Sequence, residues 1–165
     1  MKALITGGAG FIGSHLAEQL LSRGWVVRII DNESTGKREN VPRKAQYLRG
    51  DVRDPLALRK AFAGHIDVVF HLAAQVSNIL SYADPTEDVT TNVGGTLNVL
   101  EACIRHRVRR LLHASSMALY GQQDVMPVNE AAPCRPLSFY GISKLAAEQY
   151  VLAMADRKGL KTPLH

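Results

Sequence analysis

The stretch TGGAGFIGSH, residues 6–15, decides the fold of this chain. It follows a short apolar run at 2–6 and opens a segment, 11–23, in which apolar residues recur at helical spacing. Its spaced glycines therefore form a turn between a strand and a helix. Without side chains, such a turn lets backbone N–H groups approach a pyrophosphate at the helix N-terminus, where the helix dipole favours anions. The stretch predicts a dinucleotide site; the alternative is a glycine-rich turn without a ligand.

Strands and helices alternate along the rest of the chain. The sequence predicts strands over 2–6, 25–30, 46–49, 67–72 and 108–115, and helices over 11–23, 55–63, 85–107 (with some irregularity) and 139–158. Asp54, Asp84 and Ser138 are expected to cap three of the helices, and Gly24, Gly64 and Gly159 to end three of them. This alternation predicts an α/β fold, a Rossmann-like doubly wound parallel sheet of about five strands.

Length and composition are those of one globular domain. The chain has 165 residues, of which 46% are hydrophobic and 21% charged, so it can bury a core and does not resemble a disordered protein. It lacks an apolar run of the ~18–20 residues that span a bilayer, and its first residues do not resemble a secretory signal. Cys103 and Cys134 are too few for a disulfide framework, and the histidines lack metal-ligand spacing. We expect a cytoplasmic location, no membrane partner and no metal.

The formal charge of +5 comes from 20 Lys and Arg against 15 Asp and Glu. The densest cluster, 105–110, lies between a predicted helix end and the next strand, where cations complement the helix dipole. Because aromatic residues that could stack on bases are not interleaved with it, we expect no nucleic-acid partner. Small anionic ligands such as phosphates stay compatible with the charge.

Two carboxylates follow the second and third predicted strands. Asp31 lies 21 positions after Gly10, where a carboxylate accepts hydrogen bonds from the adenosine ribose of a dinucleotide. It would repel a 2′-phosphate, so NAD is favoured over NADP; the alternative is a solvated turn residue. Asp51, in the stretch GDVRD, could accept from the adenine amino group, but a plain turn residue fits it nearly as well.

The stretch YGISK places Tyr140 and Lys144 on one face of the last predicted helix. Tyrosine has a pKa of about 10 in water, too high for a base at neutral pH. An ammonium ~4 Å away, at an effective dielectric of ~20, favours the phenolate by about 4 kcal/mol. The pair therefore predicts a general base, although such a pair is also common without any chemistry. Ser116, at the end of the fifth strand, could relay a proton or hold a substrate hydroxyl, and Ser115 is its alternative.

Together these stretches resemble the extended short-chain dehydrogenase/reductase family, in its NAD-dependent nucleotide-sugar epimerase/dehydratase branch. The resemblance covers Met1 to about Leu160. Besides residues 6–15 it rests on DNESTG (31–36), GDVRD (50–54), VFHLAAQ (69–75), TNVGGTLNVLEA (91–102), ASSMALYG (114–121) and YGISK (140–144). It implies an NAD-binding Rossmann domain over 1–165, NAD as the cofactor and a nucleotide sugar, in particular a UDP-sugar, as the substrate.

The resemblance also implies residue roles. Ser116, Tyr140 and Lys144 would be the catalytic set, with Tyr140 removing the proton of the sugar 4-hydroxyl while hydride passes to NAD and returns on the other face. The cofactor would be contacted by Gly7, Gly10, Phe11, Ile12, Gly13, Asp31, Asn32, Asp51, Val52, Leu72, Ala73, Ala74, Asn92, Tyr140 and Lys144. Met117 and Ala118 stand where dehydratases of the branch carry an Asp-Glu pair, so epimerisation or simple oxidation is implied rather than elimination.

Members of the branch are considerably longer, and their second half supplies the last strands and most of the sugar pocket. We therefore expect a truncated chain that lacks the substrate-binding part and leaves its fifth strand as a sheet edge. Two interpretations stay open: an epimerase, or a non-catalytic NAD-binding module; a scaffold without a cofactor is a third. Family members dimerise through two long helices, which here correspond to 85–107 and 139–158 and predict a homodimer.

Overall fold

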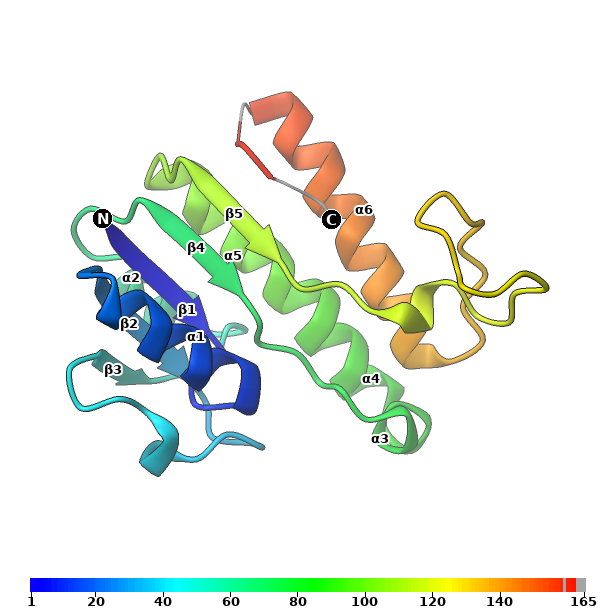
Figure 1. Cartoon of the computed structure of the whole chain (residues 1–165), viewed down its shortest axis with the longest axis horizontal. Coiled ribbons are helices and arrows are strands. Elements are labelled where there is room, and N and C mark those ends of the chain that lie inside the picture. The colour runs from blue at the N-terminus through cyan, green and yellow to red at the C-terminus, as the bar shows by residue number, and fades with distance from the viewer. Residues whose placement is uncertain (159, 163–165) are drawn as a thin grey trace.

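The computed structural model describes residues 1–158 and 160–162, which build a five-stranded parallel sheet with helices on both faces (Figure 1). The strands are β1 (Lys2–Thr6), β2 (Val26–Asp31), β3 (Gln46–Arg49), β4 (Val68–His71) and β5 (Arg110–His113). Their order is β3-β2-β1-β4-β5, and every neighbouring pair is parallel. The chain runs outward from β1 to β3 and then crosses back to β4, so the order reverses between β1 and β4. The predicted fold class is confirmed.

Alternate residues of the strands face two separate cores. On one side, Ile5 and Ile29 pack with Ala17 and Leu20 of helix α1 (Phe11–Ser22). On the other side, Leu4 and its neighbours pack against helices α2 (Pro55–Ala61), α5 (Gly95–Arg105) and α6 (Phe139–Lys158). The central strands β1 and β4 are mostly buried on both faces, as expected for a parallel sheet covered by helices, whereas the edge strands β3 and β5 are more exposed.

Most helix ends lie within two residues of their predicted places. Asp54 caps α2 by accepting from Leu56 N at 2.8 Å, and Ser138 Oγ accepts from Gly141 N at 3.0 Å at the start of α6. Gly24 and Gly64 adopt φ angles of +76° and +78° just beyond α1 and α2, a conformation that glycine adopts without strain. The helix end predicted at Gly159 lies outside the described residues.

The helix predicted over 85–107 is interrupted. It consists of α4 (Pro85–Val89), a π-helical segment η2 (Thr90–Gly94) and α5, and a short helix α3 (Asn78–Ala83), which the sequence did not predict, precedes it. Ser77 caps α3, and Asp84 caps α4. The wider η2 turn lies below the carboxyl end of the sheet and carries the buried Asn92.

Within the described chain, β5 is the outer strand on one side of the sheet, as expected. Beyond it, Lys161 forms a single parallel bridge with Arg110, and Leu111 N donates to Lys161 O at 3.1 Å. The segment between η3 (Met117–Leu119) and α6 extends away from the sheet (Figure 1). Among the described helices, we find none that is long and apolar enough to cross a membrane.

Candidate active site

A cleft of about 620 Å³ lies at the carboxyl ends of the central strands, where the strand order reverses. This is the position at which doubly wound sheets bind ligands. The predicted residues that line it are Gly7, Gly10, Phe11, Ile12, Gly13, Asp31, Asn32, Asp51, Val52, Leu72, Ala73, Ala74, Tyr140 and Lys144. Two predicted residues, Asn92 and Ser116, are not part of its lining. Residues that were not predicted, among them Gln75, Val76 and Leu80, also line it, as does Ser115, the alternative to Ser116.

The glycine turn forms one end of the cleft. Gly7 has a φ of +72°, and a Cβ there would lie 2.7 Å from Ala73 N, so the turn approaches the end of β4 too closely for a side chain. A Cβ on Gly13 would lie 2.3 Å from Gly7 O. The first intrahelical bond of α1 runs from Ser14 N to Gly10 O, which leaves the N–H groups of Phe11, Ile12 and Gly13 without an acceptor inside the helix. These donors, together with the helix dipole, suit a phosphate.

Asp31 closes the neighbouring side of the cleft. It is buried, Oδ2 accepts from Ala9 N at 2.9 Å, and Oδ1 accepts from Glu33 N at 2.8 Å. A carboxylate has about four lone-pair sites, so it can accept further hydrogen bonds from a ligand. The glycine turn and the loop after β2 therefore fix this carboxylate at the rim, where it was expected.

Asp51 has partners that the sequence did not suggest. Arg53 binds both of its oxygens, with Nε to Oδ1 at 3.0 Å and Nη2 to Oδ2 at 2.8 Å, and Asn32 Nδ2 donates to Oδ2 at 2.9 Å. These hydrogen bonds, from Arg53 above all, lower the pKa of Asp51 to about 2. Arg53 also pairs with Glu87, so it ties the loop after β3 to α4. Asp51 is thus a fixed carboxylate in an ion-pair network at the cleft.

Tyr140 and Lys144 enter the cleft from the first turns of α6. Lys144 is 4% exposed, and its Nζ donates to Ala114 O at 2.6 Å, just after β5. Burial lowers the pKa of Lys144 to about 8, opposed by the negative charges of Glu148 and Asp88. The ammonium is therefore the main form at neutral pH. The structure brings both predicted residues to the cavity that the glycine turn also lines.

Ser116 lies beside the cleft and has a local structural role. Its Oγ accepts from Ala118 N at 3.2 Å and so caps the 3₁₀ helix η3. Its neighbour Ser115 lines the cleft instead. The sequence thus favours Ser116, whereas the lining of the cleft contains Ser115.

Asn92 lies beneath the cleft rather than in it. Its Oδ1 accepts from Gln75 N at 2.8 Å, and its Nδ2 donates to Gln75 O at 3.0 Å. Nδ2 also lies 3.0 Å from Ser143 Oγ and 3.2 Å from Asp88 Oδ1. Gln75, Asp88 and Ser143 were not predicted as site residues, although Gln75 ends the stretch VFHLAAQ. Asn92 thus fixes the loop that follows β4.

Two histidines lie next to Lys144. His71 is 1% exposed, its two nitrogens pair with Thr6 Oγ1 at 2.7 Å and Thr96 Oγ1 at 2.9 Å, and burial lowers its pKa well below the usual value. The ring of His113 lies 5.3 Å from that of His71. Burial, and then the charge of Lys144, lower the pKa of His113 to about 3. Both imidazoles are neutral at pH 7. Within the described residues, no group of three or more His, Cys, Asp or Glu could hold a metal ion.

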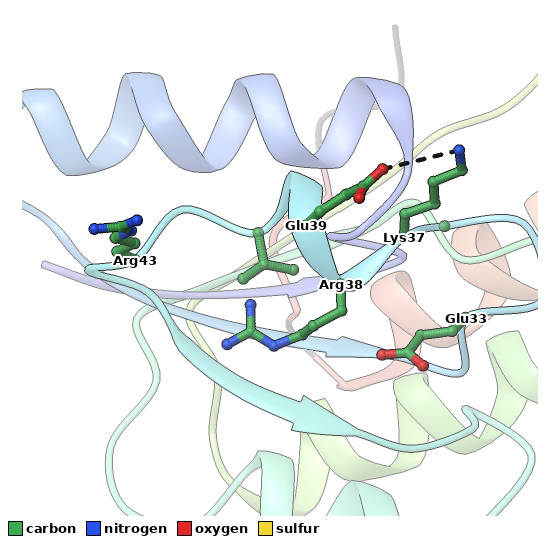
Figure 2. Close-up of a pocket in the computed structure, with 7 residues that line it drawn as sticks. Glu33, Lys37, Arg38, Glu39 and Arg43 are labelled. Atoms are coloured by element: carbon green, nitrogen blue, oxygen red, sulfur yellow. Dashed lines mark ion pairs between the residues drawn. The ribbon is translucent and has the colours of Figure 1, made fainter.

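A second depression, of about 950 Å³, lies over the loop that joins β2 to β3 (Figure 2). Lys37 forms a long ion pair with Glu39, at 3.9 Å, and the guanidinium of Arg38 lies 4.6 Å from the Tyr47 ring centroid. The hydroxyl of Tyr47 donates to Glu33 Oε1 at 2.6 Å. All of these contacts lie within the β2–β3 loop and β3. They fix the conformation of the loop that follows Asp31.

Comparisons with known proteins point to one group of enzymes. A profile of the NAD dependent epimerase/dehydratase family matches residues 3–163. UDP-glucose 4-epimerase of Streptomyces lividans is 42% identical over 161 residues, which cover 96% of this chain and 49% of that protein. The enzyme of Corynebacterium glutamicum is 40% identical over 160 residues, covering 97% of this chain and 48% of its own.

Solved structures agree. UDP-glucose 4-epimerase of Thermus thermophilus, in complex with NAD, superposes with a TM-score of 0.94 at 44% identity, over 98% of this chain and 53% of its own. The Thermotoga maritima enzyme with UDP-glucose gives a TM-score of 0.95 at 39% identity, with the same coverage of 98% and 53%. This chain spans about half the length of the curated relatives it matches.

Proposed function

Because this chain belongs to the NAD dependent epimerase/dehydratase family, we propose that it carries the NAD site and the acid–base residues of a UDP-sugar 4-epimerase. One observation carries the proposal: a single cleft joins the free N–H groups at the start of α1 to Tyr140 and Lys144 on α6. A dinucleotide bound along such a cleft would have its adenosine at Asp31, its pyrophosphate over the start of α1 and its nicotinamide near the acid–base pair.

The residues present fit NAD. The N–H groups of Phe11, Ile12 and Gly13 suit its pyrophosphate, because the start of a helix favours anions. Asp31 suits the two hydroxyls of the adenosine ribose and opposes a 2′-phosphate by charge repulsion. Asn32 donates a hydrogen bond to Asp51, so these side chains are already partly satisfied. We therefore propose that they line the adenosine part of the site rather than provide its main hydrogen bonds.

The chemistry divides between the cofactor and this chain. When bound, NAD supplies a reversible acceptor for the hydride of the sugar C4. Tyr140 takes the proton of the 4-hydroxyl and later returns one to the same oxygen. Lys144, an ammonium held by Ala114 O, stabilises the negative charge that forms on the tyrosine oxygen.

Ser116 would assist by donating a hydrogen bond to a sugar oxygen. A hydroxyl that accepts from Ala118 N still has its own proton to donate. Ser115 is the alternative, because it lines the cleft. Met117 and Ala118 can neither donate nor accept a proton, which supports epimerisation over elimination of water.

The alternative is an NAD-binding module without turnover. The position of Ser116 outside the cleft lining favours it. Under this alternative NAD binds to the same glycine turn, but no sugar reacts.

Turnover distinguishes the two. The chain is incubated with NAD and a panel of UDP-sugars, and the 4-epimers are separated and quantified. If the chain carries the epimerase activity, product forms, and Y140F lowers its rate of formation by about 10²–10⁴-fold because the general base is removed. Y150F, which changes an exposed tyrosine on the same helix, is the matched control. Binding of NAD without product from any UDP-sugar would contradict the epimerase and support the module.

We also propose a homodimer that forms through α4–α5 and α6. These helices correspond to the segments 85–107 and 139–158, through which the sequence predicted dimerisation. α5 and α6 pack side by side, and Val89 of α4 and Leu152 of α6 are exposed. Light scattering on the purified chain measures this directly.

We also propose a cytoplasmic location. Both cysteines are free, which is consistent with a reducing compartment.

A further inference from the structure

A chain of polar side chains lies beneath the cleft, and the mechanism above does not use it. Asp88, on α4, is 1% exposed. Its Oδ1 accepts from Gln75 Nε2 at 2.8 Å and from Asn92 Nδ2 at 3.2 Å. One carboxylate oxygen thus joins the loop after β4 to the η2 turn. A buried carboxylate is costly unless hydrogen bonds or an opposite charge compensate it.

The same chain continues to the catalytic helix. Asn92 Nδ2 donates to Ser143 Oγ at 3.0 Å, and Ser143 Oγ donates to Tyr140 O at 3.0 Å. Ser143 directly precedes Lys144. The contacts of Asp88 are therefore transmitted, through Asn92 and one serine, to the helical turn that carries both reactive side chains.

The charges around Lys144 single out the same residue. The charge of Lys144 helps to lower the pKa values of His71 on β4 and His113 on β5, and both imidazoles are neutral at pH 7. The negative groups that act on Lys144 are Glu148, one turn later on α6, and Asp88 from α4. Of these two, Asp88 is the one that is fully buried.

We propose that Asp88 is a positioning residue: its carboxylate fixes Gln75 and Asn92 beneath Tyr140 and supplies the buried counter-charge of the Lys144 ammonium. This rests on the proposed function, because it assigns a role in that site. The two parts of the role are separable, since an amide in place of the carboxylate keeps the shape and an oxygen acceptor but loses the charge.

The test is a pH titration of lysine side chains by NMR, with ¹³C and ¹⁵N labels, on the whole chain without NAD or sugar. K144R identifies the Lys144 signal by its loss. In the unchanged chain we expect a midpoint of about 8. In D88N the midpoint should fall by about one pH unit, because removal of a nearby negative charge favours the neutral amine. E101Q, which removes an exposed carboxylate on α5, should leave it unchanged.

A second variant separates position from charge. E148Q should also lower the Lys144 midpoint, but only D88N should shift the side-chain amide signals of Gln75 and Asn92 as well. If D88N fails to fold, the unchanged chain still decides, because the Asp88 carboxyl carbon should show an inflection at the pH at which Lys144 titrates. An unmoved Lys144 midpoint in folded D88N, or no such inflection, overturns the proposal. Since no substrate is used, failure here differs from failure of the turnover assay.

Discussion

At the scale of residues, His71 and His113 show how differently two neighbouring imidazoles can be held. Both nitrogens of His71 are paired with buried threonine hydroxyls. Both nitrogens of His113 are buried without a partner within the described residues. A buried polar atom without a hydrogen bond costs roughly 1–3 kcal/mol. The two unpartnered nitrogens of His113 therefore lower the free energy of unfolding of the chain.

We predict that H113F stabilises the chain by about 1–2 kcal/mol at neutral pH, because it removes two buried nitrogens that have no partner within the described residues. Burial holds the pKa of His113 at about 3 in the folded chain, whereas an exposed histidine titrates near ~6.5. Between these values the unfolded chain binds a proton that the folded chain does not, so stability falls as the pH drops through that window. H113F should lose less stability over the same window, as measured by denaturant unfolding at several pH values.

The matched variant is H71F. It removes one hydrogen bond from each of the buried hydroxyls of Thr6 and Thr96, which keep only their bonds to the backbone, so it should destabilise the chain. Stabilisation by both variants, or by neither, would contradict this account of the two histidines.

Some residues of the cleft could be predicted from the sequence, and others could not. Gly7 and Gly13 were predictable as cleft residues because glycines at this spacing between a strand and a helix have few other uses. Tyr140 was predicted only in combination with that glycine turn, because a Tyr/Lys pair on a helix is also common without any chemistry. The ion pair of Asp51 with Arg53 was not, because a carboxylate in a turn has many available partners and only the fold decides which one is near. Asp88 was missed for a related reason, since a helical acidic residue usually faces solvent.

At the scale of elements, α1 is fixed differently at its two ends. At its start, a Cβ on Gly13 would collide with the main chain of the glycine turn, at 2.3 Å from Gly7 O. At its end, Gly24 has a positive φ, but a Cβ there would meet nothing within 4 Å. The first position tolerates no side chain because of close packing, and the second resists one only because of backbone strain.

We predict that G13A abolishes NAD binding, because the turn must move away from the helix and takes the phosphate-facing N–H groups with it. G24A should cost about 1–2 kcal/mol in unfolding free energy and leave NAD binding unchanged. Isothermal titration with NAD and thermal unfolding of both variants measure this. Equal NAD affinity in G13A and the unchanged chain would exclude the glycine turn as the phosphate site.

Elements with a strong apolar period were predictable within about two residues. The short helix α3, with the sequence NILSYA, was missed because six residues are too few to show a helical period. The π-helical segment η2 was expected only as an irregularity. Its extra residue per turn is stabilised by tertiary contacts, such as those of Asn92, which no local pattern records.

At the scale of the whole molecule, NAD and the fold should stabilise one another. The cleft is lined by residues from the loops after β1, β2, β3, β4 and β5, so a bound dinucleotide would contact segments that separate on unfolding. A ligand that binds only the folded chain stabilises it in proportion to the logarithm of its concentration.

We predict that NAD at 100 times its dissociation constant raises the unfolding free energy by about 2.7 kcal/mol. NADP at the same concentration should stabilise less, because Asp31 opposes its extra phosphate. Thermal shift measurements over a series of concentrations check both statements, and in D31N the difference between the two cofactors should shrink. A larger shift with NADP would argue against the role given to Asp31.

The central position of β1 has a consequence for synthesis on the ribosome. This first strand lies between β2 and β4, and Lys2 N and Thr6 Oγ1 bond to Asp67 and His71, partners 65 residues further along. β1 is translated before β4, so one edge of β1 stays unpaired until β4 has been synthesised. Only then can a nascent chain acquire a pocket at all.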